Sequence, residues 1–537
     1  MIFPRSLSQW TGLIVAALIC VSLFASDTIA HSQLLTSTPS ASEIVNERPG
    51  ELRLTFNEPV SPASIKWFTP DGSEQAVSDA RSDKNDLVVP VPDALERGTH
   101  LISYRVTSID GHVVAGSFAF SLGEATTAPE ARTSPANTPA RLAAIGRFVL
   151  TLALTLGAGG AAFFSLVVRG MEMPVWPRKL ALSGAVLAAL AIPLNIGLQG
   201  LDLTGGTAAG LFSAAPYIAG FGSPFAPTAG LAFAASLLAI TALGSGSSGF
   251  GLFAGLLAWL IAAASFAASG HAATADPQAL MRPAIAIHAA AFLYWLGSLP
   301  GLLAIARTQP EHIDRLLSRF SLIAIPAVAF LFGTGIAISA VQVGAPEYLD
   351  TTDYGLILTL KIAAFLALVG LAGINRLVLT PDIARGEGSG ARRLAASIRV
   401  ELLLALAILI AASSFRLTPP PRAIMAADRA GASVHIHQDE GFGNITALPG
   451  RRGENRAILD LFAGNAEALT AREVTVSFSQ AARGVEPIRI AATRGEGGLW
   501  FAEPLPLTVS GPWDVQIEVL INDFKELRLE GVLEIRP

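Results

Sequence analysis

The sequence predicts a multi-domain membrane protein: an all-β sandwich, then an eight-helix transmembrane bundle, then a second all-β sandwich. Of the 537 residues, 51% are hydrophobic and only 15% are charged, and the mean hydropathy of +0.52 exceeds that of ordinary soluble proteins. The long apolar runs are confined to residues 141–417. Much of the sequence on either side alternates between apolar and polar residues, which is typical of half-buried strands.

The first thirty residues have the pattern of a secretory signal peptide. Arg5 provides the positive start, the run from Leu13 to Phe24 is apolar, and Thr28-Ile29-Ala30 is a small-residue cleavage site. The single cysteine, Cys20, lies inside this segment, so we expect a mature chain without a disulfide or a thiolate metal site. The alternative is an uncleaved first membrane anchor. Cleavage would make His31 the N-terminus.

Residues 31–123 predict a small all-β sandwich, because short strands separated by Pro, Gly, Asn and Asp are typical of such domains. The expected strands include 52–56, 101–106 and 113–122, with Gly116 at a bulge. Residues 124–140 are rich in Ala, Thr and Pro and predict a linker.

The apolar runs of the middle region predict eight membrane spans, because a span needs about 20 apolar residues. The expected spans are 142–168, 180–200, 226–243, 250–269, 283–306, 320–343, 355–378 and 396–416. The boundary between the third and fourth spans is the least defined, because only the Gly- and Ser-rich stretch 244–249 separates them.

Charge placement supports this topology through the positive-inside rule. If the first β-domain is outside, the inner connections carry Arg169, Arg178, Lys179, Arg307, Arg315, Arg319, Arg385, Arg392 and Arg393. The outer connections carry the acidic residues Asp202, Asp276, Glu347, Asp350 and Asp353. Their only basic residue is Arg282. Arg141, Arg147 and Arg416 go against the rule. An even number of spans returns the C-terminus to the outside.

A second β-domain is expected after the last span. Pro419, Pro420 and Pro421 cannot lie in a helix interior, and residues 418–430 predict a linker. Residues 431–537 alternate again, as in Val474–Phe478 and Val515–Val519, and predict a second sandwich outside the membrane.

The mature N-terminus is a candidate metal ligand. His31 offers its α-amine and its imidazole, while Asp110 and His112 offer a carboxylate and a second imidazole on either side of Gly111. Two imidazoles, an amine and a carboxylate suit Cu(II) in tetragonal geometry. The alternative is an unstructured N-terminus and a histidine in a turn.

These residues also carry a family resemblance. The segments 31–34, 37–39, 54–60 and 108–118 resemble the periplasmic copper-binding protein CopC, and 269–272, His288 with 295–297, 354–355, Lys361 and 375–376 resemble the inner-membrane protein CopD. Residues 431–537 are similar to YtkA-like β-sandwich domains, more loosely. The chain is thus identified as a copper-resistance CopC–CopD fusion of a bacterial inner (plasma) membrane, multi-pass, with both β-domains extracytoplasmic.

The resemblance implies that His31, Asp110 and His112 bind Cu(II), with His31 binding through both amine and ring. Some CopC proteins also carry a methionine-rich Cu(I) site. This chain has no methionine between His31 and Ala140, which argues against such a site because thioethers suit Cu(I).

Two histidines of the membrane region are further candidates. His271 is expected at the outer end of the fourth span, and His288 roughly 8 Å into the fifth. Ionisable residues within spans are functional candidates by default, so both are expected to contact copper, as Cu(I) or Cu(II). The alternative is a histidine that hydrogen-bonds a backbone carbonyl of the bundle.

The remaining polar candidates have weaker assignments. Lys361 is expected to compensate charge or to snorkel, with a direct function as an equal alternative. Glu401 is expected to pair with Arg399 or with another helix near the inner face, with a role in transport as the alternative. His435 and His437 share one face of a likely strand and predict an auxiliary metal site, with an exposed polar face as the alternative. His100 is expected to be structural or exposed, and His312 to be solvated.

The expected function is capture of copper outside the membrane and its passage to or across the bilayer, in copper import, homeostasis or resistance. Periplasmic copper carriers are expected partners, and the small net charge of −5 gives no reason to expect nucleic acid. No nucleotide-binding loop or catalytic triad stands out, so neither ATP-driven transport nor an enzyme is expected. The alternatives are a copper sensor or storage protein, a copper monooxygenase using His31, and a haem-bearing oxidoreductase.

Overall fold

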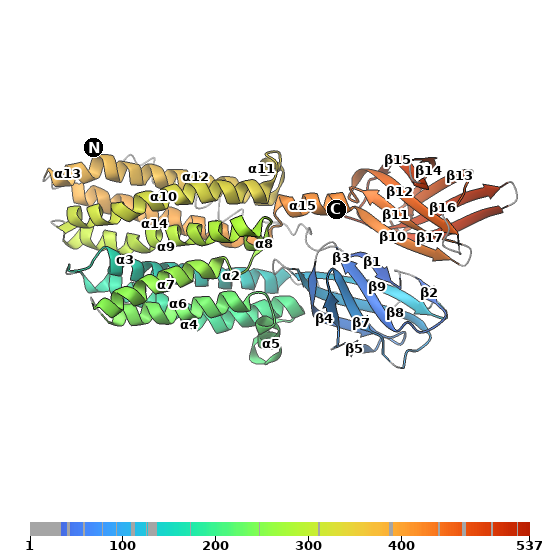
Figure 1. Cartoon of the computed structure of the whole chain (residues 1–537), viewed down its shortest axis with the longest axis horizontal. Helices are drawn as coiled ribbons and strands as arrows, with labels where there is room; N and C mark the ends of the chain where they lie inside the picture. Colours follow the sequence, from blue (N-terminus) through green and yellow to red (C-terminus); the bar gives the residue numbers. More distant parts are fainter. Residues whose placement is uncertain are drawn as a thin grey trace. The chain divides into compact units, whose positions relative to one another are not determined.

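The computed structural model describes residues 34–39, 43–56, 59–77, 79–92, 94–108, 113–124, 126, 137–171, 173–245, 248–309, 312–385, 390–438, 441–463, 469–495, 498–522 and 525–536. The helical region, up to Arg422, forms one compact unit, and the two β-regions belong to a second (Figure 1). The predicted order of sandwich, helix bundle and sandwich is confirmed.

The first β-domain contains two sheets, with strand orders β1-β3-β7-β6 and β2-β9-β8-β4-β5 among the described residues. Its strands are β1 (Leu34–Thr38), β2 (Ile44–Val45), β3 (Glu51–Phe56), β4 (Val60–Phe68), β5 (Glu74–Ala76), β6 (Arg81–Asp83), β7 (Asp86–Pro90), β8 (Gly98–Ser108) and β9 (Val113–Leu122). Leu52, Leu54 and Phe56 are fully buried, whereas the residues between them are half-buried. This period of two is the expected signature of a strand with one face on the core.

The expected bulge at Gly116 is wrong. Strands β8 and β9 pair without a register shift from Gly98 opposite Leu122 to Thr107 opposite Val113. Gly116 lies opposite Tyr104, and a Cβ atom at Gly116 would overlap the Tyr104 ring. The glycine therefore makes room for a cross-strand aromatic side chain.

The helical unit has eight segments long and apolar enough to cross a membrane among the described residues, as predicted. Its elements are α2 (Asn137–Leu154), η1 (Thr155–Gly159), α3 (Gly160–Leu166), α4 (Val175–Thr204), η2 (Ala208–Phe212), α5 (Ala215–Phe221), α6 (Ala226–Gly244), α7 (Gly249–Phe266), α8 (His271–Thr274), α9 (Gln278–Thr308), α10 (Ile313–Val343), α11 (Tyr348–Thr351), α12 (Asp353–Ile374), η4 (Asn375–Leu379), α13 (Thr380–Ala384), α14 (Gly390–Ser414) and η5 (Phe415–Leu417). Two of the spans contain a π-helical turn, η1 after α2 and η4 after α12.

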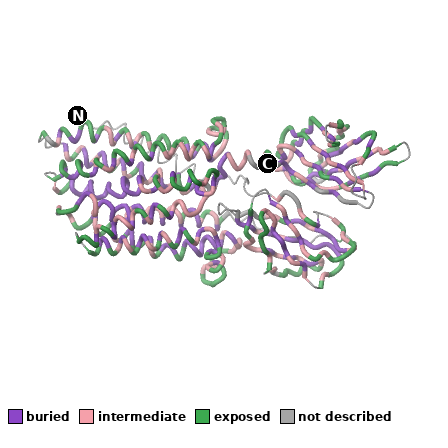
Figure 2. The backbone as a smooth tube through the Cα atoms, viewed as in Figure 1, coloured by how far each residue is buried: buried purple, intermediate pink, exposed green. Residues whose placement is uncertain are grey.

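Helix α9 is the central helix of the bundle. In its most apolar stretch 89% of residues are buried, against 17% in α10 and 28% in the span that begins with α12, and Figure 2 shows the same contrast. Gly297 of α9 packs directly on the backbone of the first span, where an added Cβ would lie 2.5 Å from the Thr155 carbonyl oxygen. A small residue at this point lets two helices approach closely, as in other membrane bundles.

Two of the arginines that go against the positive-inside rule have partners inside the helical unit. Arg416 Nη2 lies 2.6 Å from Asp202 Oδ2, and both side chains are 15% exposed. The Arg147 guanidinium lies 3.6 Å from the centroid of the Phe225 ring. Their positions are therefore set by contacts within the bundle as well as by loop topology.

The segment 418–430, expected to be a linker, is largely helical. Helix α15 (Pro421–Ala430) occupies it, because proline at the first helical position lacks only an N–H group that would be unpaired there anyway.

The last β-domain has the strand order β10-β11-β12-β15-β14-β13-β16-β17 among the described residues. The strands are β10 (Ala432–Gln438), β11 (Gly441–Leu448), β12 (Gly453–Ala463), β13 (Glu473–Gln480), β14 (Val485–Arg494), β15 (Trp500–Leu507), β16 (Gly511–Asn522) and β17 (Lys525–Ile535). Strands β10, β11, β12 and β15 form one half of this sheet, and β14, β13, β16 and β17 form the other. The two halves are joined by two residue pairs between β14 and β15. Phe478 and Trp513 are fully buried in the core.

Candidate metal centres

The three predicted Cu(II) ligands of the first domain, His31, Asp110 and His112, lie outside the described residues. The neighbouring strands are described. Leu34 of β1 pairs with Phe56, and Ser108 of β8 pairs with Val60.

Phe56 and Val60 are four residues apart in the chain, which spans at most about 14 Å. The start of β1 and the β8–β9 connection are therefore at the same end of the domain. His31 is three residues before Leu34, and His112 directly precedes β9. The described residues next to the predicted ligands, Leu34 and Ser108, are therefore at one end of the domain, and the metal site itself stays a prediction.

His100 has a structural role in the same domain, as expected. It is fully buried, and Trp67 Nε1 donates a hydrogen bond of 3.0 Å to His100 Nδ1. The proton is therefore on Nε2, which donates to the Glu96 carbonyl oxygen at 2.8 Å. Burial lowers the pKa of His100 below its usual value. Both ring nitrogens are used, so His100 has no free position for a metal.

His271 lies in a different element from the one expected. The fourth span ends at Phe266, and His271 begins α8, a four-residue helix before α9. Arg282 of α9 is near α8, with its Nε 3.4 Å from the Ala273 carbonyl oxygen. The side chain of His271 is outside the described part of the chain, so its contact with copper stays a prediction.

His288 lies deeper along its helix than expected. Helix α9 begins at Gln278, not at residue 283, which places His288 ten residues, or about 15 Å, from the start of the helix. Its Nδ1 atom lies 3.0 Å from the Thr334 hydroxyl of α10. The earlier helix start accounts for the difference.

The hydrogen bonds around Thr334 assign the state of the His288 ring. The Thr334 hydroxyl has one proton and donates it to the Phe330 carbonyl oxygen, so it accepts from Nδ1–H of His288. Nε2 then carries a lone pair, and no described residue hydrogen-bonds to it. A neutral imidazole with one nitrogen fixed by a hydrogen bond is the form that binds metals.

A further ionisable side chain, Lys361 of α12, lies inside the helical unit. Its Nζ atom is 5.6 Å from the centroid of the Phe415 ring, which also packs on Tyr354 with 4.5 Å between centroids. Lys361 therefore has an aromatic partner inside the helical unit, which the sequence pattern did not indicate.

Glu401 does not pair with Arg399, one of the two options expected. Asn375 Nδ2 donates to Glu401 Oε1 at 2.6 Å, while Arg399 is exposed. The other option, a partner on another helix, is confirmed.

His435 and His437 lie on β10, where their Cα atoms are opposite Asn444 and Phe442 of β11. They alternate with Val434 and Ile436, which are buried. Their side chains lie beyond what the structure describes, and the auxiliary metal site stays a prediction.

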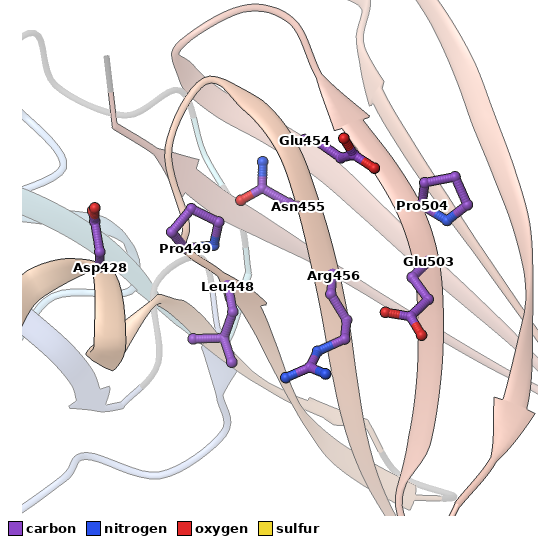
Figure 3. Close-up of a pocket in the computed structure, with 8 residues that line it drawn as sticks. All are labelled: Asp428, Leu448, Pro449, Glu454, Asn455, Arg456, Glu503 and Pro504. Carbon is purple, nitrogen blue, oxygen red and sulfur yellow. The ribbon is translucent and has the colours of Figure 1, made fainter. Parts of the chain in front are cut away.

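Figure 3 shows a hollow in the last β-domain, lined by Asp428, Leu448, Pro449, Glu454, Asn455, Arg456, Glu503 and Pro504. Asp428 lies 3.6 Å from Arg451 and 3.3 Å from Arg536, so its charge is compensated. Within the described ranges, no three His, Cys, Asp or Glu side chains form a group that could hold a metal ion. The hollow is therefore not a metal centre of that kind.

Comparison with known proteins gives two family matches. Residues 34–123 match the CopC domain, and residues 314–415 match copper resistance protein D, CopD. The CopD match covers Thr334, Lys361 and Glu401, whereas His271 and His288 precede it.

Individual proteins are also similar to this chain. The copper transport protein CutJ of Bacillus subtilis (strain 168) is 22% identical over 93% of this chain and 95% of its own length. Protein YobA of Escherichia coli (strain K12) is 30% identical over 22% of this chain and 95% of its own length. The crystal structure of CopC from Methylosinus trichosporium OB3b is 29% identical, covers 19% of this chain and all of that one, and has a TM-score of 0.16.

These matches fall on the first β-domain and on the last spans of the bundle, and CutJ extends across both. The family names point to copper binding, resistance or transport and not to catalysis. The chain belongs to the copper-resistance proteins as a fusion of a CopC domain with a CopD membrane domain.

Proposed function

We propose that this protein captures copper outside the membrane and transfers it to or across the bilayer. The observation that carries this proposal is His288: a neutral imidazole inside a membrane span, fixed at Nδ1 by Thr334, with Nε2 available as a ligand. Family membership supports copper as the cargo.

The first step is binding of Cu(II) by His31, Asp110 and His112. The strand register supports this step, because it brings the start of β1 and the β8–β9 connection to one end of the domain. Eight spans return the chain to the side on which it started, so both β-domains are extracytoplasmic in this proposal. His435 and His437 then offer an auxiliary site on that same side.

The second step is transfer through the bundle, with His271 and His288 as ligands of Cu(I) or Cu(II). A storage site should bind its ion tightly, whereas a transit site must also release it. The relative named copper transport protein CutJ, which matches 93% of this chain, favours transfer over storage and over a sensor.

The test is copper uptake by liposomes that contain the full-length protein. We expect uptake by the natural chain, a loss of at least tenfold with His288→Ala, and little change with His312→Ala, a matched exposed histidine that precedes α10. Equal uptake by His288→Ala and the natural chain would overturn the assignment of His288.

Capture is tested on the same full-length protein by Cu(II) titration with spin-resonance spectra. A chain with one extra residue before His31 should bind Cu(II) more weakly, because its N-terminal chelate is lost. Tight binding without uptake would favour a storage or sensor protein, and equal binding by both chains would overturn the N-terminal site.

A further inference from the structure

A second polar group lies inside the bundle, away from the histidines. Glu401 of α14 is 3% exposed, Asn375 of η4 is 9% exposed and Ser397 of α14 is fully buried. Glu401 and Ser397 are four residues apart, so they lie on the same face of α14. Asn375 reaches this face from the neighbouring span.

Glu401 has no counter-charge in the described part of the helical unit. Asn375 is the one polar group found to act on it, through the 2.6 Å hydrogen bond. The elements packed around α14 carry charged groups, but no described one forms an ion pair with Glu401. Asp382 of α13 pairs with Arg385 and Arg393, Arg376 and Arg399 are exposed, and Lys361 lies fourteen residues before Asn375, roughly 21 Å along the span.

The free-energy cost of burying a charge determines whether the Glu401 carboxyl group is protonated. A carboxylate without water or a cation is strongly disfavoured in an apolar interior, and such a group becomes neutral by binding a proton. The surroundings offer a partner to each form. The Asn375 amide donates to the ionised carboxylate, and a half-turn of the same amide would present its oxygen to the protonated one. Asn375 Oδ1 and Ser397 Oγ have no hydrogen-bond partner among the described residues.

The backbone at Asn375 has an unusual conformation. Residues Asn375–Leu379 form the π-helical turn η4 inside the span that begins with α12. Such turns are rare and occur frequently at functional sites. The same span carries Lys361, fourteen residues earlier.

We propose that Glu401 is a proton-binding site and that its proton is exchanged during the passage of copper. This inference rests on the proposed function. The Glu401 carboxyl releases its proton to water when a copper cation enters the bundle, and it binds one again when the cation has left. No electron is transferred in this step.

The first measurement is independent of transport. Infrared spectra of the full-length protein in detergent should show the carbonyl band of a buried protonated carboxyl group, shifted in D2O. The band should be lost in Glu401→Gln and retained in Glu347→Gln, a matched change at an exposed glutamate. It should shift in Asn375→Leu. No band attributable to Glu401 at any pH at which the protein is folded would overturn the proposal.

The second measurement uses liposomes with a trapped pH indicator. Copper uptake by the natural chain should be accompanied by a proton signal, which Glu401→Gln should lower at least tenfold while leaving Cu(II) binding at the N-terminus unchanged. An unchanged proton signal in Glu401→Gln would overturn the coupling. If the natural chain takes up no copper but shows the infrared band, the transport proposal and the coupling fail and the proton-binding site stands.

Discussion

Arg416 and Asp202 form an ion pair of 2.6 Å that joins the end of the last span to the end of the second. The two residues are 214 positions apart in the sequence, and each side chain is 15% exposed. Removing one partner of a buried pair leaves the other charge uncompensated.

Variants of this ion pair should therefore differ in stability. Asp202→Asn should destabilise the helical unit by about 3 kcal/mol, visible as a lower thermal unfolding midpoint of the detergent-solubilised protein. The double change Asp202→Leu with Arg416→Met should cost less than Asp202→Asn alone. Arg392→Met, at an exposed arginine, serves as the control. A double variant no more stable than the single one would contradict this account.

Thr334 sets the tautomer of His288, so its hydroxyl should matter for copper. Thr334→Val keeps the shape but removes the acceptor for Nδ1–H. We expect copper uptake to fall about tenfold, as it does when a hydrogen-bond partner of a metal-binding histidine is removed. Thr334→Ser should retain most of the activity. Uptake that is equal in Thr334→Val and the natural chain would show that the hydrogen bond has no such role.

Gly116 should not tolerate a side chain. Gly116→Ala places a methyl group on the Tyr104 ring and should destabilise the first β-domain by about 2 kcal/mol, measured as faster hydrogen exchange in peptides from β8 and β9. Gly50→Ala is the matched control, because nothing lies within 4 Å of its added Cβ. Combining Gly116→Ala with Tyr104→Leu should restore part of the protection.

The first β-domain should lose stability in mild acid because of His100. Burial lowers the pKa of this ring in the folded domain from 6.5, so the unfolded chain binds the proton first as the pH falls. The stability is complete above pH 6.5 and declines below it, until the pH passes the folded pKa.

His100→Gln should remove this part of the pH dependence, measured by hydrogen exchange of β8 peptides in the full-length protein. A separate decline is expected at lower pH, because hydrogen bonds from Thr69 and Ser73 lower the pKa of Asp71 to about 2. A stability that is flat from pH 7 to pH 5 in the natural chain would exclude the His100 effect.

Local patterns in the sequence predicted the fold well. The alternation of Leu52, Leu54 and Phe56 predicts β3, and apolar length predicts eight spans, because strand period and span length are properties of consecutive residues. The prediction of a bulge at Gly116 was wrong because it depends on a residue that is not adjacent in the sequence. The need for glycine there comes from Tyr104, twelve residues away on the paired strand.

For the candidate sites, too, the sequence predicts single residues but not their partners on other helices. Residue types inside spans marked His288, Lys361 and Glu401 as functional candidates. Their partners Thr334, Phe415 and Asn375 come from other helices, and no spacing in the sequence connects them. The predicted helix ends near His271 and His288 were also wrong. Helix α9 continues through Arg282 and Pro283, which end the apolar run in the sequence, and α7 stops at Phe266, before the apolar run does.

The contact between Gly297 and Thr155 makes the pairing of α9 with the first span sensitive to residue size. An added Cβ at Gly297 would lie 2.5 Å from the Thr155 carbonyl oxygen, so any larger residue there must push the two helices apart. His288 lies nine residues before Gly297 on the same helix and hydrogen-bonds Thr334 of α10. A substitution far from the histidine is therefore expected to disturb the hydrogen bond that orients its ring.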